Sequence, residues 1–140
     1  SRMLPQAVMV VVTTPQRAAQ KVAARVADMA RRSHMPVVGV IENMSGFTTE
    51  DGRHYALFGS GGGTELSDQL GVPLLGQIPL DPNVVNGGDE GRPVATEDPN
   101  GPAGAAIHSV AARLVELIPP AAEDTCTARI AVLAEQLATM

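Results

Sequence analysis

Residues 7–41 read AVMVVVTTPQRAAQKVAARVADMARRSHMPVVGVI, and this stretch decides the fold class. It opens with an unbroken apolar run at 7–12 and ends with a second apolar run at 37–41. Runs without polar alternation are typical of strands that are buried on both faces of a parallel sheet. Since a segment with helical spacing separates the two runs, the stretch predicts a right-handed β-α-β unit.

The intervening segment has the signals of a helix at both ends. Thr14 is suited to cap the first turn, and Pro15 to occupy its first position, where a missing N–H is harmless. Met35–Pro36 then breaks the helix. An apolar stripe at helical spacing is typical of a helix that packs on a core. Here the stripe comprises Ala19, Val22, Ala23, Val26, Met29 and Ala30.

The segment 42–63 is polar and rich in glycine, which predicts a long loop. Its glycine cluster at 58–63, FGSGGG, invites comparison with a phosphate-binding loop. Such a loop needs a lysine and a hydroxyl residue where it enters a helix from a buried strand, and no lysine is present here. A flexible connection is the simpler interpretation, and a weak anion site at the start of the next helix stays open as an alternative.

Shorter elements follow in the same alternating order. Apolar runs, capping residues and proline-rich gaps mark their bounds. In order, we expect a helix at 64–70, a strand at 73–78, a helical turn after Asp81, a surface connection at 89–104 and a helix at 105–118.

The whole pattern predicts an α/β fold, part of a doubly wound, mostly parallel sheet with flanking helices. A length of 140 residues suits one domain. We assign residues 4–118 to this domain and residues 119–140 to a tail with an amphipathic helix. The apolar stripe of the tail comprises Ile130, Leu133, Ala134 and Leu137.

Composition and charge exclude several classes of protein. The net charge of −5 argues against nucleic acid as a partner, since that binding needs clustered Lys and Arg. No apolar run approaches the roughly 20 residues that span a bilayer, and no signal-peptide pattern opens the chain. Cys126 is the only cysteine, so no internal disulfide can form. We therefore expect a cytoplasmic protein without a membrane partner.

Two polar turns are predicted at the carboxyl ends of strands, where open α/β sheets bind ligands. Asn43 follows the second strand, and its amide suits either an adenine edge or the closing of a turn. Pro79 and Asp81 follow the third strand, where they suit the flank of a base, or Asp81 the cap of the next helix. We expect the two turns to converge on one adenine pocket.

Neither a catalytic set nor a metal site is predicted. The three histidines stand apart, with no second ligand at metal spacing. No serine or cysteine has the sequence context of an activated nucleophile. The site residues that we assign are therefore binding residues only.

Taken together, the motifs resemble those of the Mrp (ApbC-like) family of P-loop ATPases. The similarity covers about residues 5–118, and its segments follow the order of the family. They are VVVTTPQ at 10–16, VVGVIENMS at 37–45, FGSGGG at 58–63, IPLDP at 78–82 and GDEGRPV at 88–94.

The resemblance implies the C-terminal portion of a P-loop ATPase that assembles or carries iron–sulfur clusters. It implies a homodimer that binds ATP, cluster-receiving client proteins as partners, an adenine contact for Asn43, and a base pocket lined by Pro79 and Asp81. Phosphates and Mg²⁺ would be held by an N-terminal half, because these residues contain no Walker A loop. This portion alone is therefore not expected to hydrolyse ATP.

One departure from the family concerns the cluster itself. Many members carry a Cys-x-x-Cys pair between the two motifs that end at Ser45 and begin at Phe58, whereas residues 46–55 here read GFTTEDGRHY. Thiolates are the ligands of such clusters, so the absence speaks against an iron–sulfur cluster at this place. It also favours an alternative function, a non-catalytic dimerisation or docking module. A partitioning-type ATPase is a further alternative, which the acidic charge opposes.

The first strand has a consequence for association. In the parent protein that the resemblance implies, the strand at 7–12 would be internal, so here it would leave an exposed apolar edge. We therefore expect the isolated chain to self-associate.

Overall fold

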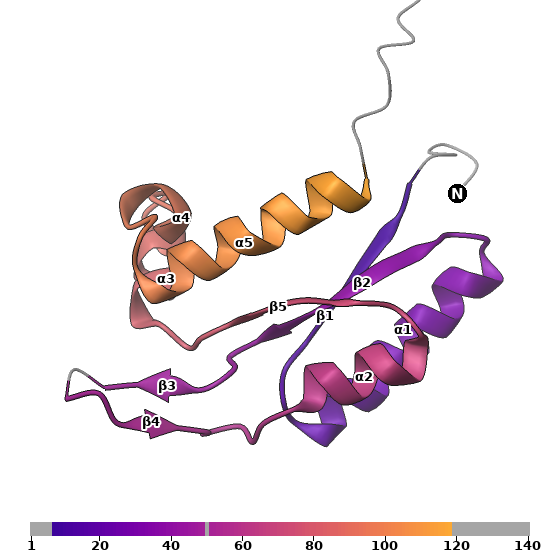
Figure 1. The fold of residues 1–140 in the computed structure, drawn as a ribbon, viewed down its shortest axis with the longest axis horizontal. Helices are drawn as coiled ribbons and strands as arrows, with labels where there is room; N and C mark the ends of the chain where they lie inside the picture. Colours follow the sequence, from indigo (N-terminus) through magenta and orange to yellow (C-terminus); the bar gives the residue numbers. More distant parts are fainter. Residues whose placement is uncertain (1–6, 50, 119–140) are drawn as a thin grey trace, which may run out of the picture.

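The computed structural model describes residues 7–49 and 51–118, and its centre is a parallel sheet (Figure 1). The strands are β1 (Met9–Thr13), β2 (Val37–Asn43) and β5 (Leu74–Ile78), in the spatial order β1-β2-β5. Thr13 pairs with Glu42, and Asn43 pairs with Ile78, so the carboxyl ends of the three strands lie at the same end of the sheet. We call this end of the sheet its carboxyl edge. The predicted parallel sheet is confirmed.

Helices cover both faces of this sheet in three layers (Figure 1). Helices α1 (Arg17–Arg32) and α2 (Gly62–Leu70) lie on one face, and α5 (Pro102–Leu117) lies on the other. Each face has its own hydrophobic core, and burial of such apolar surface is the main force that holds the layers together. The first core contains Val11, Ala23, Ala27, Val40, Leu66 and Leu70, and the second contains Ile41, Leu75 and Val110.

The smaller elements gather around the carboxyl edge of the sheet (Figure 1). A hairpin of β3 (Phe47–Thr48) and β4 (His54–Tyr55) projects from it, and α3 (Pro82–Asp89) and α4 (Val94–Glu97) connect β5 to α5. The hairpin lies in the segment predicted as a loop, and α4 in the predicted surface connection. Strands of two residues and a helix of four are too short to show a hydrophobic period.

Helix α1 differs from its prediction at its start and along its stripe. Gln16 precedes the first turn, and neither Thr14 nor Pro15 takes the predicted cap and first positions. The small residues of the helix face the sheet, whereas its larger apolar side chains are exposed. The buried residues are Ala23, Ala27 and Ala30, and the exposed ones are Val22, Val26 and Met29. The prediction that the whole stripe packs on a core was therefore wrong for its larger members.

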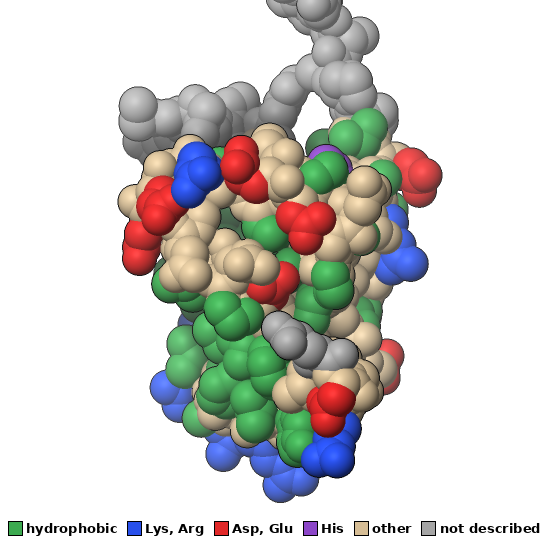
Figure 2. Space-filling model, turned by 90° about the vertical axis from the view of Figure 1, so that its left-hand side faces the viewer, with side chains coloured by type: hydrophobic (Ala, Val, Ile, Leu, Met, Phe, Trp, Pro, Cys, Tyr) green, Lys and Arg blue, Asp and Glu red, His purple; other side chains and the backbone are tan. Residues whose placement is uncertain are grey.

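The exposed face of α1 adjoins the free edge of β1. A hollow of about 450 Å³ lies there, lined by the β1 residues Val10–Thr13 and by apolar side chains of α1. Seen from the carboxyl edge of the sheet, hydrophobic side chains gather in the lower half of the molecule, with basic side chains below them (Figure 2). The apolar edge that the sequence predicts is thus present.

The predicted tail helix and Cys126 lie outside the described residues. Within 7–49 and 51–118, every helix is too short or too polar to cross a bilayer.

Candidate nucleotide-base site

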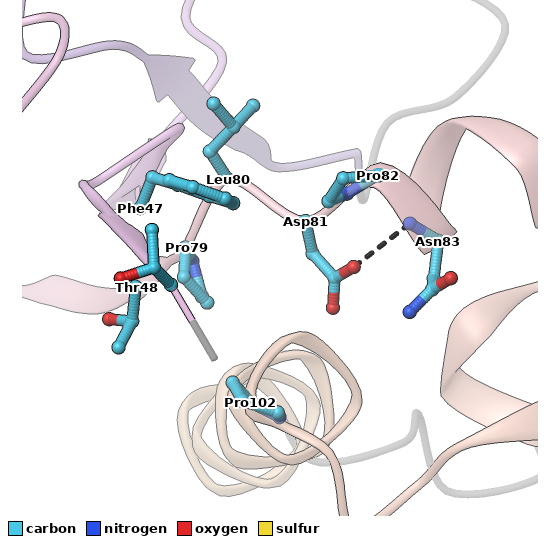
Figure 3. Close-up of a pocket in the computed structure, with 9 residues that line it drawn as sticks. Phe47, Thr48, Pro79, Leu80, Asp81, Pro82, Asn83 and Pro102 are labelled. Carbon is cyan, nitrogen blue, oxygen red and sulfur yellow. Dashed lines mark hydrogen bonds between the residues drawn. The ribbon is translucent and has the colours of Figure 1, made fainter. Parts of the chain in front are cut away.

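A pocket of about 330 Å³ opens where β5 ends, between the β3–β4 hairpin and the start of α5 (Figure 3). Its volume lies at the lower end of the range of small-molecule sites, which is about 300–1,000 Å³. In the close-up, Phe47, Thr48 and Pro79 lie on one side, Asp81 and Asn83 on the other, and Pro102 faces them from α5. The full lining comprises Phe47, Thr48, Thr49, Pro79, Leu80, Asp81, Pro82, Asn83 and Pro102.

Asp81 has a structural partner inside this pocket. Its Oδ1 accepts a hydrogen bond of 2.9 Å from the backbone N–H of Asn83, so it caps α3 as the sequence predicts. Pro82 occupies the first turn, where its missing N–H is harmless. The cap fixes the carboxylate at the pocket wall and leaves it acceptor capacity, because an ionised carboxylate has about four lone-pair sites.

Asn43 lies at the same edge of the sheet but opens into the other hollow. It lines the apolar hollow beside β1 together with Thr13 and Thr14, and it is absent from the lining of the Asp81 pocket. Its Oδ1 accepts a hydrogen bond of 2.9 Å from the backbone N–H of Met44, which has a left-handed φ of +57°. The structure thus brings Pro79 and Asp81 together and sets Asn43 one strand away. That all three bind one base stays a prediction.

Glu42 is the residue of this region that sequence reasoning missed. Its side chain is fully buried, at 0% exposure. Its Oε1 accepts hydrogen bonds from Ser45 Oγ at 2.6 Å and Gln77 Nε2 at 2.8 Å, and its Oε2 accepts one from the backbone N–H of Gly63. A carboxylate is rarely buried without such partners. The available signal was a glutamate that continues the apolar run of β2.

The end of the glycine cluster is closely packed, so the prediction of a flexible connection was wrong for Gly62 and Gly63, whereas Gly59 and Gly61 have open space around them. Gly62 and Gly63 are buried and form the first turn of α2. A methyl group at Gly62 would lie 2.6 Å from the carbonyl oxygen of Pro15, and one at Gly63 would lie 2.6 Å from Cβ of Glu42. Glycine is needed there because the Pro15 backbone and the Glu42 side chain approach α2 too closely for a further side chain.

The β3–β4 hairpin occupies the place of the missing cysteine pair. Thr48 Oγ1 lies 3.2 Å from His54 Nδ1, and Arg53 forms an exposed ion pair with Asp51 at 3.1 Å. In residues 7–49 and 51–118, no three His, Cys, Asp or Glu side chains are grouped as metal ligands. Hydroxyl, imidazole and guanidinium groups do not form the thiolate set of an iron–sulfur cluster, so this hairpin does not fit one.

The comparisons with known proteins agree with the motifs. A family model described as ParA, the NUBPL iron-transfer P-loop NTPase, matches residues 1–115. The chain is 44% identical over 117 residues to an iron–sulfur cluster carrier protein of Mycobacterium tuberculosis, a match that covers 79% of this chain and 31% of the relative. It is 39% identical over 110 residues to the human cytosolic Fe-S cluster assembly factor NUBP2, covering 78% and 41%.

A solved structure supports the fold. The septum site-determining protein MinD of Pyrococcus horikoshii, complexed with Mg-ADP, superposes with a TM-score of 0.62 at 24% identity. The match covers 81% of this chain and 43% of MinD, so it shows a P-loop NTPase-like fold for the shared portion. In each comparison the chain spans well under half of the longer protein. Motif order, fold and family model together place this sequence in the family of NUBPL-type iron-transfer P-loop NTPases, which confirms the resemblance to Mrp ATPases.

Proposed function

We propose that this chain is the adenine-recognition portion of an ATP-binding, ATP-hydrolysing protein of the iron–sulfur carrier type. The observation that carries the proposal is the pocket at the carboxyl edge of the sheet, in which Pro79 and Asp81 lie beside Phe47. Ligands of open α/β sheets bind at this edge. The apolar wall suits the face of a purine ring, and the carboxylate suits its polar rim.

Asp81 supplies selectivity for adenine over guanine in this proposal. The 6-position of adenine carries an amino donor, whereas that of guanine carries a carbonyl acceptor. A carboxylate accepts hydrogen bonds only, so we place Asp81 opposite the 6-position, where it pairs with the adenine amino group and repels the guanine oxygen. Opposite the N1–H and 2-amino groups it would favour guanine instead, and the comparison of ADP with GDP distinguishes the two arrangements. Phe47 and Pro79 contact the ring faces without distinguishing the two bases.

Phosphate and Mg²⁺ binding belong to residues outside this chain. A Walker A loop needs a lysine next to a hydroxyl residue, and no such pair occurs in the sequence. We propose that an N-terminal half supplies this loop, that the complete protein is a cytoplasmic homodimer, and that iron–sulfur proteins are its clients. A glycine- and lysine-rich loop encoded upstream of Ser1 is the observation that would support this division, and its absence would oppose ATP hydrolysis.

The missing cysteine pair favours one alternative, a docking or dimerisation module without catalysis. Anaerobic reconstitution of the complete protein with iron and sulfide distinguishes the two. A brown, iron-containing dimer supports cluster carriage by other residues. A colourless, iron-free product supports the docking module.

The base pocket is tested by calorimetric titration of the 140-residue chain with ADP and GDP. We expect ADP to bind more tightly than GDP, and Asp81→Asn to reduce the ADP preference by about tenfold, the usual effect of one hydrogen bond to a charged group. Asparagine is also a good helix cap, so the fold should survive this substitution. The matched control is Asp89→Asn, at the far end of α3 and outside the pocket lining. Equal ADP preference in the two variants would remove Asp81 from the base site.

A further inference from the structure

The buried carboxylate of Glu42 links three segments: the two that lead into the walls of the base pocket, and the first turn of α2, which contains Gly62 and Gly63. We propose that Glu42 is a positioning residue. It holds the two pocket walls in place relative to each other and links them to the start of α2. The inference rests on the proposed base site, but the geometry of the hydrogen bonds does not. Glu42 itself touches no part of the pocket lining that a ligand would reach, so it acts through its neighbours.

The first wall is the turn that leads from β2 into the hairpin. Ser45 donates to Oε1 of Glu42 at 2.6 Å, and Phe47 of the pocket follows two residues later. The second wall is the end of β5. Gln77 donates to the same Oε1 at 2.8 Å, and Pro79 follows two residues later. One oxygen atom therefore receives a hydrogen bond from the segment that leads into each wall.

Backbone hydrogen bonds join the two walls at their far side. Ser45 N–H donates to the carbonyl of Ile78 at 3.0 Å, and Leu80 N–H donates to the carbonyl of Gly46 at 2.8 Å. Together with these bonds, the Glu42 side chain hydrogen-bonds to the segments that lead into both walls and to a third element. A shift of the carboxylate is therefore transmitted to the two pocket walls together.

The third element is the first turn of α2. Oε2 of Glu42 accepts from the backbone N–H of Gly63, at the end of the helix where the macrodipole favours a negative charge. The protein's own carboxylate thus takes one of the backbone donors that an anion at this helix end would use. Gly62, one residue earlier, packs against the carbonyl of Pro15 after β1. The network consequently extends from the β1–α1 turn to the base pocket.

The test substitutes Glu42→Gln, which keeps the side-chain volume but turns one acceptor into a donor. Against Gly63 N–H, the new amide group places two donors face to face. Against Ser45 and Gln77, it forces the Ser45 hydroxyl to accept and the Gln77 amide to turn over, so the two segments must rearrange. The matched control is Glu65→Gln, an exposed glutamate in the first turn of the same helix. Ser45→Ala is a milder second variant, because it removes the link to one wall only.

Two measurements on the full 140-residue chain separate positioning from stability. The first is the backbone amide NMR spectrum without ligand, and we expect Glu42→Gln to move the signals of Phe47 and Leu80 as well as that of Gly63. The second is the ADP dissociation constant, measured well below the melting temperature, which we expect to rise about tenfold. Ser45→Ala should move Phe47 more than Leu80, and Glu65→Gln should move neither.

The proposal is overturned if Glu42→Gln lowers the melting temperature while Phe47, Leu80 and the ADP dissociation constant stay unchanged. If Glu42→Gln does not fold, Ser45→Ala decides: unmoved signals of Phe47 overturn the proposal, and moved signals support it. If the unmodified chain fails to bind ADP, the proposed function fails by itself. The ligand-free NMR shifts then still decide whether Glu42 positions the two walls.

Discussion

The two outer strands of the sheet meet their surroundings in opposite ways. On β5, Leu75 is 1% exposed beneath α5, and the Arg113 guanidinium donates hydrogen bonds to the carbonyls of Leu75 at 2.9 Å and Leu74 at 3.3 Å. On β1, Val12 is 57% exposed beside the apolar hollow. Apolar strand edges without cover favour pairing with further chain. The comparison shows that, within the part of the chain that the structure describes, α5 covers the β5 side, whereas the β1 side presents exposed apolar surface.

We expect further chain to cover this surface, and the length of the relatives supports that expectation. The chain spans 31% of the M. tuberculosis carrier protein and 43% of MinD, so longer members of this fold have additional chain to place beside the shared portion. We expect a further parallel strand, from the N-terminal half that the proposed function requires, to pair with β1. Until it does, a second copy of the same chain is the available partner.

The largest expected effect on stability compares the buried Leu75 of β5 with the exposed Val12 of β1. Leu75→Ala should lower the free energy of unfolding by about 2–5 kcal/mol, the usual cost of a buried leucine, because it leaves a cavity under α5. Val12→Ala should change it by less than about 0.5 kcal/mol, because the side chain is mostly in water already. Urea denaturation of both variants measures the difference. Equal losses would mean that the β1 side is covered in solution.

Association of the isolated chain is the second test. We expect the chain to form dimers or larger species, and the double substitution Val12→Lys with Val26→Lys to weaken that association by about tenfold to a hundredfold. About half of each valine is still exposed, so the two together lose about 1.5–3 kcal/mol of burial. Sedimentation velocity over a range of concentrations measures it. Val85→Lys is the control, because Val85 is as exposed but lies in α3. A monomer at all concentrations would contradict the prediction that the exposed β1 edge causes self-association.

The smallest effect concerns the arginine on β5. Arg113→Met keeps an aliphatic stem over the strand and removes two hydrogen bonds to its carbonyls. We expect a loss of about 1 kcal/mol in unfolding free energy, since the carbonyls regain water on this partly open side. Hydrogen exchange of β5 amides should quicken while that of β1 amides stays the same. Faster exchange in both strands would show that the two edges are coupled.

Local signals were sufficient for much of the architecture. The apolar runs of β1, β2 and β5 and the pair Asp81–Pro82 each determine their structure through neighbours close in sequence, so pattern and capping rules predicted them. Helix α1 was harder, because the spacing of Val22 and Val26 shows that they share a face but not what covers that face. An apolar stripe predicts that some surface packs against it. It does not indicate whether that surface belongs to the same chain or to another.

The features that the sequence did not predict depend on contacts between distant segments. Glu42 is bonded to Gly63 and Gln77, which lie 21 and 35 residues away along the chain. The same contacts make glycine necessary at position 63. From the local composition alone, this position looks like part of a flexible glycine-rich run. The separation of Asn43 from Asp81 likewise follows from the hollow beside β1, which exists only once the layers are assembled. None of these features has a local period to detect.

Met44 gives the turn after β2 a further property. A residue with a side chain pays about 1–2 kcal/mol to stand in the left-handed region, and here the Asn43 amide oxygen bonds its N–H at a φ of +57°. Met44→Gly would remove this cost, because glycine adopts these backbone angles without a side-chain clash. The conformation of this turn is therefore stabilised by the surrounding fold and not by the preference of its own residue.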